Sequence, residues 1–121
     1  MVIISNSELE IIKVLWDKSP LTAPQVVEAL RDKTEWEENT IKTLLTRLVK
    51  KGAVTQSGRK RSYMFAPAVG RDEYRLQAVK RFLGQLFDSD VQSLMCFCVQ
   101  NCKLDSKDIE QLQKLLEEKA Q

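Results

Sequence analysis

The chain of 121 residues contains no histidine. This absence removes histidine-based general acid–base catalysis and the commonest protein ligand of transition metals. The sequence also shows no phosphate-binding glycine-rich loop, no nucleophile elbow and no pair of acids in a distinctive setting. We therefore expect no enzymatic activity and no cofactor.

Long apolar runs are missing too. The longest is far shorter than a bilayer span, and the N-terminus lacks basic residues followed by an apolar signal stretch. Apolar residues nevertheless make up 43% of the chain, which is enough for a folded core. These features predict a cytoplasmic protein without membrane insertion.

Cysteine is scarce, and the three residues Cys96, Cys98 and Cys102 lie together in "CFCVQNC". An odd number argues against a disulfide framework. Close thiolates suit soft ions such as Cu(I) or Zn, but Cys96 and Cys98 would point to different faces of a helix. We favour a structural role, with Cys98 as a small buried apolar residue, and keep all three as weak metal candidates.

Acidic residues are scarce in one part of the chain. The net charge is only +2, but residues 36–61 contain seven cations and two acids, whereas residues 105–121 contain three cations and five acids. A local surplus of positive charge is typical of a surface that meets an anionic partner.

The stretch "NTIKTLLTRLVKKG", residues 39–52, has the period of an amphipathic helix. Its apolar face is formed by Ile41, Leu44, Leu45, Leu48 and Val49. The opposite face, formed by Asn39, Thr43, Thr46, Arg47 and Lys50, is polar and cationic and carries no carboxylate. Gly52 follows two lysines, a strong signal for the helix end.

Two helices should precede this stretch, and a hairpin should follow it. Ser5 or Ser7 can cap the first helix, which Pro20 stops, and Thr22 begins the second with a T-x-x-Q capping box. Trp36 is expected as an anchor between helices. The hairpin comprises "AVTQS", the turn "GRK" and "RSYMFA". Three helices and a hairpin predict a winged helix-turn-helix.

A helix without acids on its outer face fits the major groove of duplex DNA, whose walls are phosphate. Arg47 is the best candidate for bidentate contact with guanine, and Lys42 and Lys50 are expected to bind phosphate. The threonine hydroxyls could reach phosphate or base edges. The hairpin tip adds Arg59, Lys60 and Arg61 as a second cationic element.

Residues 71–121 carry three amphipathic stripes with little to cover them, which favours burial against a second copy of the chain. We therefore predict a DNA-binding domain at residues 1–70 and a helical dimerisation region at residues 71–121. The predicted dimer residues are Tyr74, Phe82, Leu94, Met95, Leu112, Leu115 and Leu116.

These motifs resemble the BlaI/MecI family of penicillinase repressors. The likeness rests on "ELEIIKVLWDKSPLTAPQVVEAL", the later "TIKTLLTRLVKKGAV" and "RSYMFAPAV", and it extends more weakly to the C-terminus. It implies a homodimeric winged-helix repressor of palindromic operators, controlling a β-lactam resistance or related stress operon. The recognition-helix positions it implies are Thr40, Lys42, Thr43, Thr46 and Arg47.

The chain departs from this family at two places. Glu37 and Glu38 follow Trp36, where the family often has a Ser-Pro-like cap. The family's inducing protease cuts an Asn-Phe bond, and Phe97-Cys98 stands at the corresponding place. The cysteines also give a distant likeness to copper repressors of the CopY type. The alternatives are therefore a metal- or thiol-responsive repressor on this scaffold, or a winged-helix protein–protein adaptor.

Overall fold

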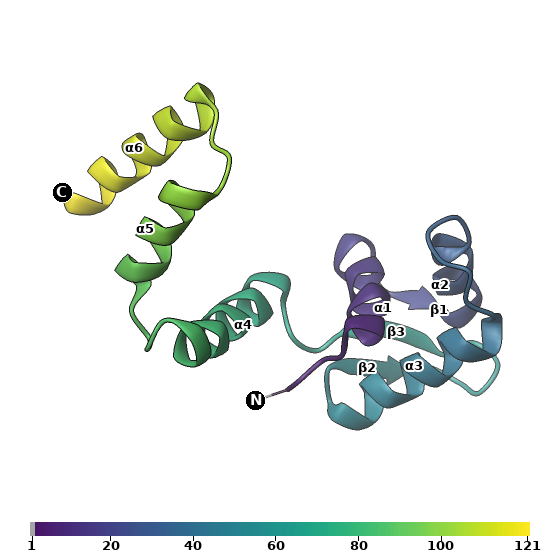
Figure 1. Ribbon diagram of the computed structural model, residues 1–121. Coiled ribbons are helices and arrows are strands. Elements are labelled where there is room, and N and C mark those ends of the chain that lie inside the picture. The colour runs from purple at the N-terminus through teal and green to yellow at the C-terminus, as the bar shows by residue number, and fades with distance from the viewer. Residues whose placement is uncertain (1) are drawn as a thin grey trace. The chain divides into compact units, whose positions relative to one another are not determined.

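The computed structural model describes residues 2–121 as helices with one small antiparallel sheet (Figure 1). The elements are α1 (Asn6–Asp17), β1 (Leu21–Thr22), α2 (Ala23–Leu30), α3 (Glu38–Lys51), β2 (Val54–Ser57), β3 (Met64–Pro67), α4 (Arg71–Leu86), α5 (Val91–Asn101) and α6 (Ser106–Ala120). The chain divides into two compact units, of which the first ends at Gln77 and the second is Ala78–Gln121. The predicted fold class, mainly helical with a winged helix-turn-helix, is confirmed.

The helix boundaries follow the capping signals of the sequence. Ser5, and not Ser7, caps α1: its hydroxyl accepts from the Glu8 N–H, and the Glu8 carboxylate accepts from the Ser5 N–H. Thr22 and Gln25 form the predicted capping box of α2. Gly52 ends α3 in the left-handed region, at φ 80°, which an L side chain rarely adopts.

The sheet has the order β1-β3-β2. The hairpin of β2 and β3 is present, but its last pair is Ser57 with Met64, so residues 58–63 form a longer tip than predicted. β1 escaped prediction because two residues are too short to show alternation; it pairs Leu21 with Phe65 and joins the start of α2 to the hairpin.

The core of the first unit lies between α1, α2 and α3. Ile11, Ile12 and Leu15 of α1 are fully buried, as are Val26 and Leu30 of α2. These residues pack against the predicted apolar face of α3. In that face Ile41, Leu44, Leu45 and Leu48 are buried and Val49 is half-buried. Trp36, expected as a buried anchor, is half-buried.

The first turns of α4 belong to the first unit. Tyr74 is buried, and its ring lies 5.9 Å from that of Trp16, whose indole N–H donates to the Val69 carbonyl at 2.9 Å. Arg71 binds Asp17 of α1 at 2.5 Å. The prediction of Tyr74 as a dimer residue is therefore wrong, because its ring is used within its own chain.

The second unit exposes large apolar side chains. Phe82, Phe87 and Phe97 form a chain of ring contacts with centroids 5.8 and 5.7 Å apart. None of the residues of α5 or α6 is fully buried. The exposed large apolar residues of this unit are Val79, Phe82, Leu86, Val91, Met95, Phe97, Val99, Ile109, Leu112, Leu115 and Leu116.

An ion pair between buried Glu8 and exposed Lys51 fixes the end of α3 against the start of α1. The Glu8 side chain is 2% exposed, and its Oε1 accepts from Lys51 Nζ at 2.5 Å. Lys51 also donates to the Ile3 carbonyl at 3.0 Å. Burial raises the pKa of Glu8, but hydrogen bonds from Lys51 and Ser5 outweigh this effect, so the pKa lies below its ordinary value.

Glu8→Gln should therefore lower the free energy of unfolding at neutral pH by about 1–3 kcal/mol, because glutamine can keep the cap but loses the charged contact with Lys51. Chemical denaturation monitored by circular dichroism measures the loss. Glu10→Gln is the matched control, since Glu10 pairs with Lys13 at the surface and such pairs contribute little.

The same pair gives a pH dependence of stability. The folded-state pKa of Glu8 lies below the ordinary value of 4.5, so the unfolded state takes up the proton first as the pH falls. The stabilisation is present above that value and is lost as the pH drops through the folded-state pKa. Equal acid sensitivity of the wild type and Glu8→Gln would contradict this assignment.

Candidate nucleic-acid interface

The outer face of α3 carries no acid between Asn39 and Lys50. Asn39, Thr43, Thr46, Arg47 and Lys50 are all exposed, as the helical spacing predicts. Within residues 2–121, no carboxylate pairs with Arg47 or Lys50. Both cations are therefore available to an anionic partner.

The two threonines of this face present their methyl groups more readily than their hydroxyl hydrogens. Thr43 Oγ1 donates to the Asn39 carbonyl at 2.9 Å, and Thr46 Oγ1 donates to the Lys42 carbonyl at 3.0 Å. Each oxygen can still accept a hydrogen bond. This geometry favours contact with a thymine methyl or a base amino group over donation to a phosphate.

Arg47 borders a shallow hollow on one flank of α3, lined also by Asn39, Thr40, Thr43 and Leu44. The predicted residue Thr40 thus lies beside Arg47. This flank combines a guanidinium with short polar side chains, the residue types that read base edges in a major groove.

The opposite flank of α3 meets the hairpin tip. A hollow of about 380 Å³ is lined by Lys42, by Lys60, Arg61, Ser62 and Tyr63 of the tip, and by residues 22–24 at the start of α2. Lys42 does not stand free there, because its Nζ lies 3.1 Å from the Glu38 carboxylate. The i,i+4 spacing of this pair is visible in the sequence, but Lys42 was predicted only as a DNA contact.

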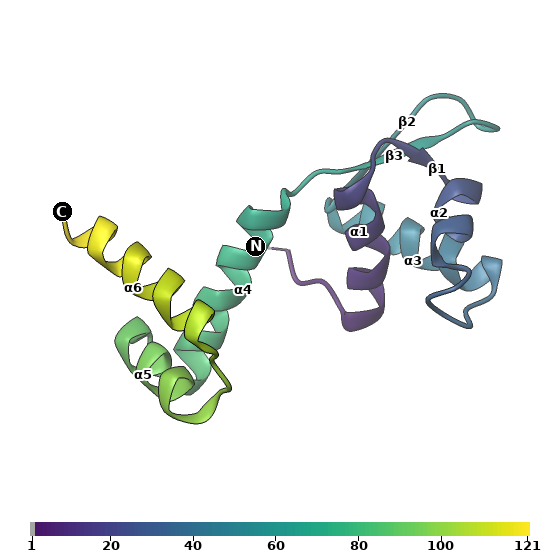
Figure 2. The same cartoon turned by 90° about the horizontal axis from the view of Figure 1, so that it is seen from above.

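The hairpin tip forms the wing and projects beyond the paired strands (Figure 2). Arg59, Lys60 and Arg61 are exposed in it. Gly58 has φ 91°, and an added Cβ would lie 3.0 Å from the Ser62 carbonyl oxygen. The Ser62 N–H donates to the Arg59 carbonyl at 2.7 Å, so a tight turn presents the three cations together.

Comparison with known protein families gives a match over nearly the whole chain. The penicillinase repressor family matches residues 4–118. This chain belongs to that family. The Bacillus licheniformis penicillinase repressor is 30% identical, covering 95% of this chain and 90% of its own length. MecI of Staphylococcus aureus, a methicillin resistance regulatory protein, is 27% identical, covering 96% and 94%.

Solved structures agree. The solution structure of the DNA-binding domain of BlaI covers 59% of this chain and 87% of its own, with 35% identity and a TM-score of 0.53. The B. licheniformis BlaI monomer bound to the blaP half-operator covers 60% and 88%, with 35% identity and a TM-score of 0.52. The family comprises DNA-binding transcriptional repressors and not enzymes.

No helix within residues 2–121 is long and apolar enough to cross a membrane.

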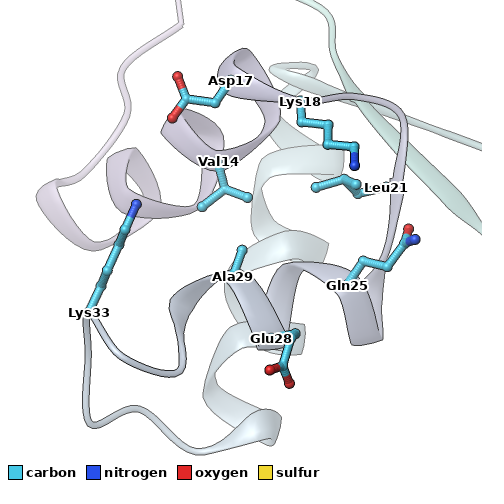
Figure 3. A pocket seen from close by; sticks show the side chains of 8 residues that line it. All are labelled: Val14, Asp17, Lys18, Leu21, Gln25, Glu28, Ala29 and Lys33. Carbon is cyan, nitrogen blue, oxygen red and sulfur yellow. The ribbon is translucent and has the colours of Figure 1, made fainter.

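A third hollow of the repressor lies between α1 and α2, away from the predicted DNA-binding residues (Figure 3). Its lining residues are Val14, Asp17, Lys18, Leu21, Gln25, Glu28, Ala29 and Lys33. Its two acids are engaged outside it, Asp17 with Arg71 and Glu28 with Arg31.

The three cysteines of the repressor lie in α5 and at its C-terminal cap. Within residues 2–121, no three ligand-type side chains gather where they could hold an ion. Cys98 is half-buried, not fully buried as we expected, while Cys96 and Cys102 are exposed. Burial and the neighbouring Cys102 raise the pKa of the Cys98 thiol, which lowers its thiolate fraction and its reactivity.

The Phe97-Cys98 bond lies inside α5. The Phe97 carbonyl accepts from the Asn101 side chain at 2.9 Å, and the Phe97 ring packs on Phe87. A protease binds its substrate in an extended form, so any cut here requires α5 to open locally. The absence of fully buried residues in α5 makes such opening easier.

Replacing Arg59, Lys60 and Arg61 together by alanine should weaken DNA binding and flatten its salt dependence, because each lost phosphate contact removes roughly 0.9 from the slope of log affinity against log salt. Titrations at several salt concentrations measure the slope. The control variant replaces Lys103, Lys107 and Lys114, three exposed lysines of the second unit, by alanine. It has the same net charge as the wing variant. Equal slopes for the wing variant and the wild type would exclude the wing from the interface.

Proposed function

We propose that this chain represses transcription as a homodimer that binds a palindromic operator through α3 and the wing. The observation that carries the proposal is the exposed, acid-free face of α3, with the free cations Arg47 and Lys50. The BlaI structure with its half-operator, at 35% identity, supports the same partner for this fold. We further propose control of a β-lactam resistance or related stress operon, on the strength of the curated relatives.

Each candidate contact has a distinct role in this arrangement. Arg47 reads a base edge, with Thr40 and Thr43 beside it in the same hollow. Lys50, near the end of α3, binds phosphate, as do Arg59, Lys60 and Arg61 of the wing. Thr46 contributes its methyl group, because its hydroxyl hydrogen is used within the helix. Two cationic elements on one rigid unit would fix the depth at which α3 enters the groove.

The second unit supplies the dimer interface in this proposal. Its exposed apolar residues include Phe82, Met95, Leu112, Leu115 and Leu116 of the predicted dimer set, and Leu94 is half-buried. Contiguous exposed apolar patches are rare on monomers and mark interaction sites. A C2 dimer would cover it and would place two copies of α3 on half-sites separated by helical turns of DNA.

Release from DNA would follow from damage to this interface. A protease that cuts between Phe97 and Cys98 would sever α5 and detach α6 from the chain before it. Losing the dimer removes bivalent binding, which contributes far more to affinity than any one contact. We therefore propose an inducing protease that accepts Phe-Cys in place of Asn-Phe.

Arg47→Ala should cost about 1–3 kcal/mol of binding free energy on the operator and relax sequence preference at one base pair, because a bidentate contact distinguishes guanine from other bases. Competition titrations with operator and mixed-sequence duplexes measure both effects. Arg75→Ala, which removes an arginine paired with Asp72 on α4, is the matched control. An equal loss on every sequence would make Arg47 a phosphate contact, and no loss at all would rule out docking by α3.

Leu112→Glu combined with Leu116→Glu should convert the dimer to a monomer, because burying two carboxylates in an apolar interface is strongly unfavourable. Sedimentation measures the change, and operator affinity should fall with it. Gln111→Glu adds charge on the other side of α6 and should leave the dimer intact. A wild-type chain that sediments as a monomer at micromolar concentration would contradict the proposed interface.

A further inference from the structure

The first residue of α3 is an acid, at the start of a helix whose outer face otherwise avoids acids. Glu38 and Lys42 form an ion pair at 3.1 Å across one helical turn, and both side chains are more than half exposed. Lys42 is the one cation of α3 that lines the hollow shared with the wing. Glu38 is therefore paired with the lysine that lies between α3 and the wing.

A carboxylate here has a structural reason to exist. The residue before it, Glu37, makes no side-chain hydrogen bond to the start of the helix, so the first N–H groups of α3 lack the cap that α1 and α2 have. A negative charge in the first turn favours the positive end of the helix dipole. The same charge repels phosphate, so helix stability and DNA affinity favour opposite residues at this position.

We propose that Glu38 limits the DNA affinity of this repressor by holding Lys42 in an ion pair, so that Lys42 reaches phosphate only when the pair opens. This inference rests on the proposed function, in which α3 and the wing face the duplex. Because phosphate contacts are insensitive to sequence, the restraint acts on operator and non-operator DNA alike. It lowers both affinities by the same factor and leaves their ratio unchanged.

A double-mutant cycle on the full-length chain tests the pair. The variants are Glu38→Gln, Lys42→Gln and the two combined, each titrated with a mixed-sequence duplex at several salt concentrations. Glu10→Gln is the matched control, because Glu10 also pairs with a lysine, Lys13, at 3.3 Å, but on α1. Thermal unfolding confirms that each variant is folded.

Glu38→Gln should bind about two- to threefold more tightly near physiological salt, because an exposed ion pair across one helical turn is weak, and should steepen the salt slope. Lys42→Gln should cost less affinity in the wild type than in the Glu38→Gln background, because Glu38 engages the lysine only in the wild type. In the combined variant most of the gain should disappear. Glu10→Gln should bind like the wild type.

Three results would overturn the inference. An equal gain from Glu38→Gln with and without Lys42 would mean that Glu38 repels DNA without restraining the lysine. Weaker binding by Glu38→Gln would mean that the carboxylate itself accepts a hydrogen bond from a base. Unchanged binding would mean that Glu38 does not face the duplex. A wild-type chain that binds no duplex at any salt concentration would instead refute the proposed function.

Discussion

The burial of one apolar face of α3 sets the orientation on which the rest of the interface depends. Ile41, Leu44, Leu45 and Leu48 are locked against α1 and α2, so the helix cannot rotate about its axis without exposing them. The side chains between them must therefore face outward. Buried Glu8 holds the far end of α3 through Lys51, and Gly52 turns the chain directly into the hairpin that carries the wing.

Charged side chains are unevenly distributed along α3. The middle and end of α3 carry threonines and cations, while the acids stand at its first turn and are balanced by the helix dipole and by Lys42. The second unit differs in kind: its helices α5 and α6 bury none of their residues within the chain. One unit thus exposes a cationic helix face, and the other exposes large apolar side chains.

The sequence was informative wherever a signal is local. Capping residues, the period of α3 and the glycine after its last lysine each report on a few neighbouring positions, and all appear as predicted. Long-range effects were missed. The burial of Tyr74 depends on Trp16 far away in the chain, and β1 exists only because β3 pairs with it. The threonine hydroxyl bonds require rotamers, which a residue pattern does not contain. Dimerisation remains a prediction, as do the individual DNA contacts.

The central claim is that duplex DNA meets the outer face of α3 and the wing. The most direct measurement is an amide-resolved NMR titration of the full-length repressor with duplex from the region upstream of its own gene. The account predicts that shift changes concentrate in residues 39–50 and 58–63. Changes confined to the hollow between α1 and α2, or to α5 and α6, with α3 and the wing unaffected, would contradict it.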